Sequence, residues 1–353
     1  MFFIAALSLI LVAALIPFAS RQAIKLGLVD KPGGRKVHCD PVAPIGGLVI
    51  FPVFLCFLLL FHPFAQIWPL ISALLLLLVL GAVDDAKPVN AKLKFVCHFV
   101  AAILIVVFGH ANLENMGYLF SHNEVHFGWF APIFSIMCAV YLINAMNMMD
   151  GIDGLAGGLA AIFTMWFMVA AALAGAIDEQ AQLFVLLGAL LGFLIHNARY
   201  KNHPCAKVFL GDAGSMAIGL ILAWYAMRLS QSTLTTLPPI SYAFIVALPI
   251  WDAFGLLAMR IKEGRPPFDP DKRHFHHHFL AAGYTPEQAT PRILAYAFTL
   301  GLIGVALPSM GVPEPIMTAI WCLFWFGHTW LTMRPEPFIA LLQKRAGNKQ
   351  HNP

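Results

Sequence analysis

Two long apolar runs meet at an acidic junction in residues 131–175, APIFSIMCAVYLINAMNMMDGIDGLAGGLAAIFTMWFMVAAALAG. The junction is NMMDGIDG at 147–154, which places Asp150 and Asp153 between the two runs. Each run has about the 17 to 25 residues that a helix needs to cross the hydrocarbon core of a bilayer. The stretch therefore predicts two consecutive membrane helices with carboxylates where they join.

The whole chain has the composition of a membrane protein. Of its 353 residues, 59% are hydrophobic and only 11% are charged, whereas soluble domains carry about 25% charged residues. Apolar runs of membrane-spanning length recur at 2–19, 45–62, 67–83, 93–109, 127–147, 154–177, 181–198, 212–229, 240–258, 291–308 and 315–333. We expect an all-α, polytopic membrane protein with about eleven transmembrane helices, forming a single domain over residues 1–353.

The basic residues predict the orientation of these helices. With eleven helices, 21 of the 22 Lys and Arg residues fall on one side, and Arg228 falls on the other. The connections that carry them are 20–44, 84–94, 199–211, 260–292 and the C-terminal tail. Because positively charged loops resist translocation, this side is predicted to be cytoplasmic, with the N-terminus outside and the C-terminus inside.

Acidic residues gather at the same predicted boundary. They are Asp84, Asp85, Asp150, Asp153 and Asp212. Any one of them alone is more simply explained as a solvated helix end. Five acids from three separate connections instead indicate a common site, because ionisable groups at a bilayer edge are costly and clustered acids are typical of metal or catalytic chemistry. Asp252, inside the ninth run, is equally compatible with a structural hydrogen bond between helices.

The chemistry of these groups favours phosphate and a hard metal ion. Carboxylates suit Mg²⁺ or Mn²⁺, and Mg²⁺ is usually held by one or two carboxylates plus substrate phosphates. The largest inner connection, 264–289, carries His274, His276, His277 and His278 beside Lys272, Arg273 and Arg265. A His-rich tract can bind metal, but neighbouring Arg and Lys favour phosphate binding here, with a solvated basic loop as the alternative for any one histidine.

Taken together, the motifs resemble one membrane enzyme family. They are GLVDKPGGRKVH (27–38), PIGGL (44–48), VDDAKPVNAKLK (83–94), NAMNMMDGIDGLAGG (144–158), VFLGDAGS (208–215) and PFDPDKRHFHHH (267–278). In this order they resemble the polyprenyl-phosphate N-acetylhexosamine-1-phosphate transferases, the superfamily that includes the phospho-MurNAc-pentapeptide translocases. The histidine pattern is similar to that of the branch that uses UDP-GlcNAc, or a related UDP-sugar, to begin O-antigen, common-antigen or teichoic-type glycans.

The resemblance implies a reaction and a location. UDP-N-acetylhexosamine and undecaprenyl phosphate would give undecaprenyl-diphosphate-N-acetylhexosamine and UMP, with Mg²⁺ or alternatively Mn²⁺. The enzyme would be a multi-pass protein of the bacterial inner membrane, in contact with the lipid bilayer. The resemblance places its active site in cytoplasmic loops 20–44, 84–92, 148–154, 199–211 and 260–290.

The resemblance also implies roles for individual residues. Asp212 is the first choice for metal ligand, together with Asp84. The catalytic acids are expected to be Asp84, Asp85, Asp150 and Asp153. Substrate-binding roles are expected for Lys92, Lys94, Asn147, Asn197, Arg265, His274, His276, His277 and His278. Which two histidines bind the diphosphate, and whether Asp84 or Asp85 acts as a base, stays open.

Other readings are disfavoured by specific features. A peptide-accepting translocase is the nearest alternative. A secondary transporter would place its site at the membrane midplane on paired repeats, and no repeat is evident. A CDP-alcohol phosphatidyltransferase would follow D-G with an A-R pair that DGIDGL lacks, and an intramembrane metalloprotease would need H-E-x-x-H. Nothing predicts nucleic-acid binding. The sequence leaves open which sugar is used and what the oligomeric state is. A homodimer is compatible with the sequence.

Overall fold

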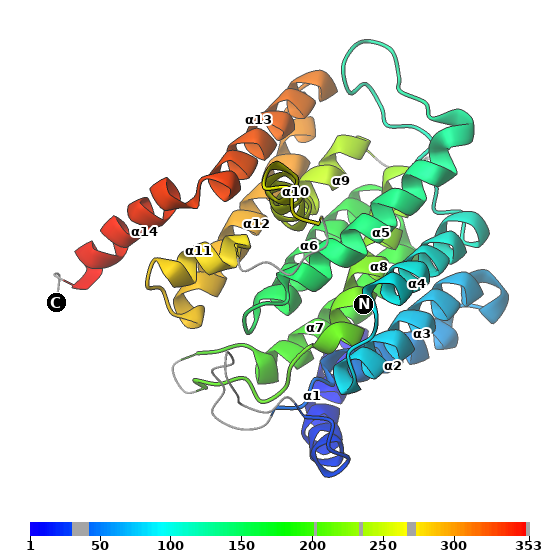
Figure 1. Ribbon diagram of the computed structural model, residues 1–353. Helices are drawn as coiled ribbons and strands as arrows, with labels where there is room; N and C mark the ends of the chain where they lie inside the picture. Colours follow the sequence, from blue (N-terminus) through cyan, green and yellow to red (C-terminus); the bar gives the residue numbers. More distant parts are fainter. Residues whose placement is uncertain (30–41, 201–202, 233–235, 267–272, 351–353) are drawn as a thin grey trace.

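The computed structural model describes residues 1–29, 42–200, 203–232, 236–266 and 273–350, and in this part of the chain every extended element is a helix. The helices are α1 (Phe2–Lys25), α2 (Gly46–Phe61), α3 (Phe64–Ala86), α4 (Ala91–Ile103), η1 (Leu104–Phe108), η2 (Gly128–Phe130), α5 (Ala131–Met149), α6 (Leu155–Leu173), α7 (Ile177–Asn197), α8 (Gly211–Ser230), α9 (Pro239–Ile245), α10 (Ala247–Lys262), α11 (Phe275–Ala281), α12 (Pro286–Ser309), α13 (Glu314–Met333) and α14 (Pro335–Gln350). The all-α prediction is confirmed (Figure 1).

The apolar helices are those of a polytopic membrane protein. Nine helices of the described residues are long and apolar enough to cross a membrane, or ten if the bent pair α9 and α10 forms one span, and α2 is a shorter apolar helix. Each of the eleven predicted runs coincides with one of these segments. The number of crossings and the orientation of the termini stay predictions. Parts of three predicted active-site loops, at 30–41, 201–202 and 267–272, lie outside the described residues.

The ninth predicted run is not a straight helix. It is broken into α9 and α10, which are inclined by 73° to each other. Pro249 accounts for the break, because it has no N–H to donate to the carbonyl of Ile245, the last residue of α9.

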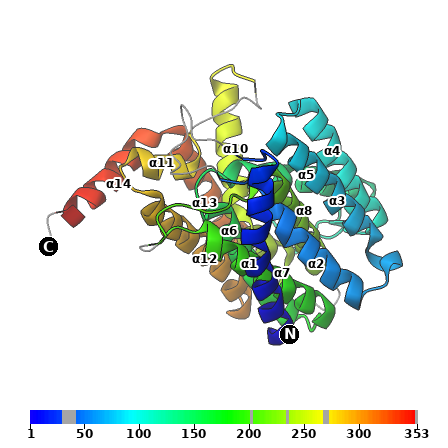
Figure 2. The same ribbon diagram turned by 90° about the horizontal axis from the view of Figure 1, so that it is seen from below.

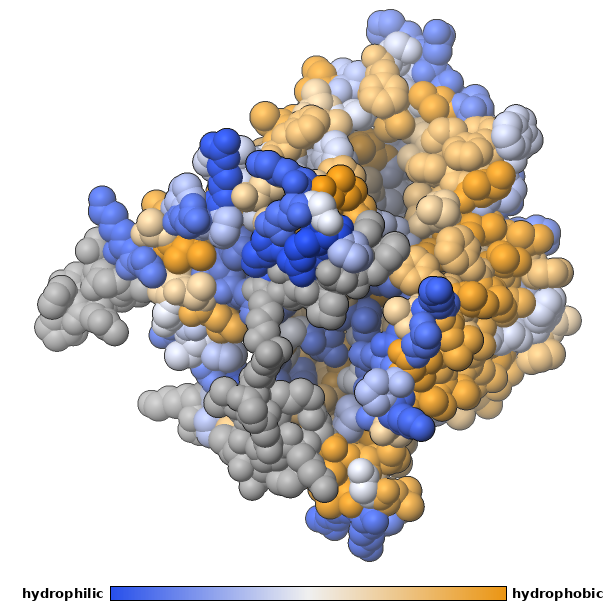
Figure 3. Space-filling view, viewed as in Figure 1, coloured by the Kyte–Doolittle hydropathy of each residue, from blue (hydrophilic) through white to orange (hydrophobic). Residues whose placement is uncertain are grey.

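Helix α8 lies at the centre of the bundle, packed against α2, α3, α5 and α6 (Figures 1 and 2). Of the apolar 18-residue stretch of α8, 89% is buried inside the protein, compared with 17% for α1 and 22% for α13 at the edges. Figure 3 shows a broad hydrophobic surface on the side of α2, α3 and α4, whereas hydrophilic residues gather near the end of α10. The peripheral helices are therefore the ones that present apolar surface to lipid.

Close packing of α3 on α8 depends on one glycine. A Cβ atom on Gly81 would collide with the backbone of Ala213. Small residues allow this approach between membrane helices. The same two helices carry Asp84 and Asp212, so Gly81 also sets how near these carboxylates can come.

We predict that Gly81→Ala destabilises the protein by about 1–3 kcal/mol, because the collision is with backbone and cannot be relieved by a rotamer change. The measurement is the thermal unfolding midpoint in detergent. Gly327→Ala on α13 is the matched control, because a Cβ there meets nothing, and it should be neutral or slightly stabilising. Equal midpoints for the two variants would contradict the packing account.

Candidate active site

The segments that precede α2 and α8 are paired through their backbones. The N–H of Phe209 donates to the carbonyl of Ala43 (3.0 Å), while those of Gly46 and Gly47 donate to the carbonyls of Phe209 and Leu210 (2.9 Å each). These residues belong to, or directly precede, the PIGGL and VFLGDAGS motifs. Two motifs that are far apart in the sequence are thus joined at the start of the central helix.

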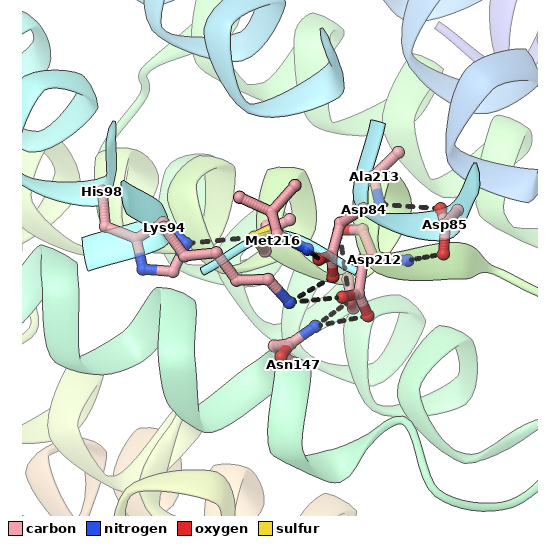
Figure 4. A network of polar contacts seen from close by, with 10 residues as sticks. Asp84, Asp85, Lys94, His98, Asn147, Asp212, Ala213 and Met216 are labelled. Carbon is pink, nitrogen blue, oxygen red and sulfur yellow. Dashed lines mark hydrogen bonds and ion pairs between the residues drawn. The ribbon is translucent and has the colours of Figure 1, made fainter. Parts of the chain in front are cut away.

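Asp85 fixes the N-terminus of α8. One oxygen of its carboxylate accepts from the backbone N–H of Asp212 (3.0 Å) and the other from that of Ala213 (3.4 Å), as Figure 4 shows. The first N–H groups of a helix have no partner within the helix, and the helix dipole favours an anion there. The catalytic role expected for Asp85 stays a prediction, but the geometry shows that its carboxylate binds the backbone of α8.

A charge cluster lies beside this helix start. The Nζ atom of Lys94 on α4 forms ion pairs with Asp84 and with Asp212, the latter at 3.0 Å. The side-chain amide of Asn147 donates to the other oxygen of Asp212 (3.0 Å) and to Ser215 Oγ (2.9 Å). Four predicted site residues from α3, α4, α5 and α8 therefore meet at one point (Figure 4).

The donor set fits a metal ion held jointly with a substrate. In the described part of the chain, no three His, Cys, Asp or Glu side chains are close enough together to hold a metal by themselves. Asp84 and Asp212 nevertheless direct carboxylate oxygens toward one cation, the ammonium of Lys94. Two carboxylates completed by phosphate oxygens are a usual arrangement for Mg²⁺. These two carboxylates alone do not complete the coordination of a metal ion.

The acidic junction quoted above is held in place by Asn197. The Oδ1 atom of Asn197 accepts from the N–H of Gly154 (2.8 Å), and its Nδ2 donates to the carbonyl of Val208 (2.9 Å). The side chain is only 5% exposed, so both ends of its amide serve the protein itself. Substrate binding by Asn197 stays a prediction, whereas its contacts show that it ties the junction to the segment before α8.

Asp150 and Asp153 have different surroundings. Asp150 is exposed, lies near enough to Asp85 and Asp212 for their charges to interact, and forms no hydrogen bond through its carboxylate to any described residue. Asp153 is paired with Arg199 (2.5 Å), which also lies 3.5 Å from Glu287 on α12. Arg199 was not among the predicted site residues, because its charge was read only as evidence of sidedness. Asp150 is the acid of this pair that is available to a ligand.

The histidine tract forms a short helix, α11, within the connection predicted as a loop. His276 is 1% exposed and lies against the junction, since a Cβ atom on Gly151 would collide with its ring. Only glycine leaves room for the imidazole at that point. The ring of His277, which is partly exposed, lies 4.2 Å from that of His276 between centroids.

The other two histidines face different partners. His274 Nδ1 is 2.9 Å from the carboxylate of Asp252 on α10. His278 packs its ring against Phe275 and Phe338, with centroids 6.5 and 6.1 Å away. Of the four histidines, His276 is therefore the one in contact with the acidic junction, and His277 is its neighbour.

The ring of His276 is buried and has no hydrogen-bond partner among the described residues. Burial, together with the neighbouring His277 and His274, lowers its pKa to about 3. Buried polar atoms nearly always have a partner. Because His276 also lies against the acidic junction, we treat its ring nitrogens as candidates for binding a ligand.

Two predicted residues lie apart from the cluster, and one unpredicted residue lies in it. Lys92 is exposed on the first turn of α4, and Arg265 lies 3.5 Å from Glu263. His98, one turn after Lys94, is buried, with Nε2 3.0 Å from the sulfur of Met216 and Nδ1 3.1 Å from the amide of Asn144. A sequence signal existed for His98, because it shares a helix face with Lys94 at i+4 spacing.

The comparisons with known proteins identify the family. Residues 67–230 match the model described as glycosyl transferase family 4. The undecaprenyl-phosphate alpha-N-acetylglucosaminyl 1-phosphate transferase of Escherichia coli (strain K12) is 33% identical, with 93% of this chain and 90% of the relative covered. The chain belongs to glycosyl transferase family 4.

Two further relatives support the assignment to glycosyl transferase family 4. The protein of the same name from Salmonella typhimurium is 32% identical over 98% of this chain and 96% of its own length. A probable undecaprenyl-phosphate N-acetylglucosaminyl 1-phosphate transferase from Bacillus subtilis is 30% identical, with coverage of 86% and 83%. The family match at 67–230 contains the whole charge cluster, while α11 lies beyond it.

We predict that Arg199→Ala lowers the thermal unfolding midpoint by several degrees, because it leaves the largely buried carboxylate of Asp153 without a counter-charge. Arg228→Ala is the control, since it removes a more exposed Arg partner, that of Glu179, whose loss should have a small effect. Limited proteolysis near 150–154 reports the same loss locally. A midpoint equal to that of the control would mean that the pair does not hold the junction.

Proposed function

We propose that this chain transfers N-acetylhexosamine 1-phosphate, with GlcNAc as the first choice of sugar, from a UDP-sugar to undecaprenyl phosphate. The products are undecaprenyl-diphosphate-N-acetylhexosamine and UMP. The relatives are named for the GlcNAc transfer, and they align over nearly the full chain. The observation in the structure that supports the proposal best is the meeting of Asp84, Lys94, Asn147 and Asp212 at one end of the membrane helices.

This position suits the two substrates. A lipid phosphate reaches the site from the membrane leaflet, and a nucleotide sugar reaches it from water. A cluster at the end of apolar helices is accessible from both. The positive-inside pattern assigns that end to the cytoplasm, so we place the enzyme in the bacterial inner membrane with a cytoplasmic active site.

The bond changes are those of a phosphoryl transfer. An oxygen of the lipid phosphate attacks the phosphorus that carries the sugar, and the bond from that phosphorus to the bridging oxygen breaks. UMP leaves with the bridging oxygen. Such reactions depend on positioning and charge neutralisation more than on covalent help from the protein.

The cationic and neutral side chains supply the positioning. Lys94 provides a point charge for phosphate oxygens, and His276 with His277 provides N–H donors for the diphosphate of the nucleotide sugar. Asn147 orients Asp212 through its amide. Asp150, which is exposed and has no hydrogen-bonded partner among the described residues, faces the same space and is assigned to the nucleotide sugar.

Asp212 with Asp84 would hold Mg²⁺, or Mn²⁺ in its place. The bound ion would neutralise charge on the diphosphate. A phosphate group has a second pKa of about 6 and is largely dianionic at pH 7, so the acceptor needs no strong base. We therefore assign Asp84 to positioning of charge, and Asp85 to the start of α8.

The first test is product analysis with the purified protein in detergent, undecaprenyl phosphate and Mg²⁺. UDP-GlcNAc, UDP-GalNAc and UDP-MurNAc-pentapeptide are compared as donors. The proposal expects UMP from UDP-GlcNAc only when lipid and metal are both present. UDP as the product would mean ordinary glycosyl transfer, and UMP from the pentapeptide donor alone would mean the translocase reaction. In the cell, the product is expected to initiate a glycan such as O-antigen.

We predict that Asp212→Asn lowers turnover by about 100-fold or more, because the loss of a charged group that stabilises the transferring phosphoryl is of this order. Asp178→Asn is the matched control, since Asp178 also lies in the first turn of a helix, α7, but is exposed and away from the cluster. UMP release is measured for both at equal amounts of folded protein. Full turnover by Asp212→Asn would remove Asp212 from the metal site.

We predict that His276→Ala raises the KM for the UDP-sugar about tenfold, the effect of losing one hydrogen bond to a charged group. The KM for undecaprenyl phosphate should change much less. His122→Ala, in the exposed connection before α5, is the control. An unchanged KM for the UDP-sugar would mean that His276 does not bind the nucleotide sugar.

A further inference from the structure

Asp252 connects the bent span to the histidine helix. Its carboxylate is only 1% exposed and lies in the second turn of α10. One oxygen is 2.9 Å from His274 Nδ1, and the other accepts from the backbone N–H of Phe275 at 2.9 Å. Both contacts fall on the N-terminus of α11, more than twenty residues away along the chain.

Helix α11, which receives these contacts, needs contacts from other elements to be stable. Helix α11 has 7 residues, and helices shorter than about 12 residues are marginal on their own. Its first N–H groups need acceptors from elsewhere. Asp252 supplies one acceptor for the backbone and one for the residue just before the helix, so it fixes both the position of the helix start and its direction.

Burial of the carboxylate makes this contact specific. A buried carboxylate is tolerated only when it is paired and hydrogen-bonded. His274, itself buried, is the side chain within hydrogen-bond distance of this carboxylate. With Nδ1 as the donor to Asp252, the ring of His274 is held in one tautomer and one orientation, parallel to that of His276 with centroids 5.7 Å apart.

Aromatic packing fixes the opposite side of α11. Phe275 stacks on Phe338 of α14 at 5.6 Å and contacts His328 of α13 at 4.8 Å. The helix is therefore clamped between a polar contact at its start and an aromatic cluster along one face. In this orientation His276 is directed at Gly151 of the acidic junction.

We infer that Asp252 is a positioning residue, that His274 is its tether and not a ligand of the substrate, and that together they set His276 and His277 to receive the diphosphate of the nucleotide sugar. The identity of the ligand rests on the function proposed above. Both contacts of Asp252 are with the start of α11, so we expect its loss to weaken binding of the nucleotide sugar more than binding of the lipid acceptor.

The first experiment compares Asp252→Ala with Glu263→Gln. Glu263 directly follows α10 and binds Arg273, the neighbour of His274, but in an exposed ion pair. Asp252→Ala should raise the KM for UDP-GlcNAc by about tenfold or more, because it removes two hydrogen bonds to a charged group, with at most about a threefold change in the KM for undecaprenyl phosphate. Glu263→Gln should change either KM by no more than about twofold.

A double-mutant cycle separates a tether from a ligand. If His274 acts through Asp252, the double variant Asp252→Ala/His274→Ala should lose no more than Asp252→Ala alone. His274→Ala should lose part of that amount, because the contact between Asp252 and the N–H of Phe275 remains. His274→Asn should recover part of the loss, because an amide N–H can replace the Nδ1 donor. Additive losses, or no recovery by Asn, would make His274 a substrate ligand and overturn the inference. Equal rises in both KM values with a lowered unfolding midpoint would also overturn it, as a general structural defect.

Binding of UDP, measured by titration calorimetry with Mg²⁺ present, separates this inference from the proposed function. Weaker UDP binding by Asp252→Ala than by wild type would support the tether even if wild type released no UMP, a result that would defeat the proposed function alone. Unchanged UDP binding by Asp252→Ala, with UMP release by wild type intact, would overturn the tether and leave the proposed function standing.

Discussion

The N-terminus of α8 is the constraint on which the rest of the site depends. Its first N–H groups are bound by the carboxylate of Asp85, and its first acidic side chain, Asp212, is bound by Lys94 and Asn147. The first N–H groups of a helix have no partner within that helix, and at the start of α8 another helix supplies it. Because α8 is also the most buried span, α3, α4 and α5 are fixed around one point by the same contacts that satisfy its end.

The site is built from two kinds of polar contact. Asp85, Asn197 and Arg199 bind backbone or counter-charges within the protein, and they determine where the junction and α8 lie. Asp150 and His276 have no hydrogen-bonded partner among the described residues. The first group gives the site its shape, and the second is available to bind a ligand. We propose that the diphosphate of a nucleotide sugar binds between them, because His276 lies against Gly151 and Asp150 lies near the charges of Asp85 and Asp212.

The sequence predicted the helices well because each apolar run is a local signal. It also predicted that Asp84, Asp150 and Asp212 would meet, since alternation of sides brings their helix ends to one boundary. The bend between α9 and α10 was missed, although Pro249 was visible, because the hydrophobic run continues through it. Side-chain pairings such as Asp153 with Arg199, or Asp252 with His274, depend on tertiary packing and have no local pattern. For the same reason the histidines could not be told apart, since the start of α11 decides that His278 packs among Phe side chains while His276 contacts the junction.

We propose that one space, bounded by the start of α8, the acidic junction and α11, receives the nucleotide sugar. A cryo-electron microscopy structure with UDP-GlcNAc and Mg²⁺ tests it most directly. We expect density for a diphosphate within hydrogen-bond distance of Lys94 and His276, with a metal ion bound to Asp212. Density for the nucleotide elsewhere, for example in the pocket beside Tyr118 and Glu314 at the opposite end of the bundle, would contradict it.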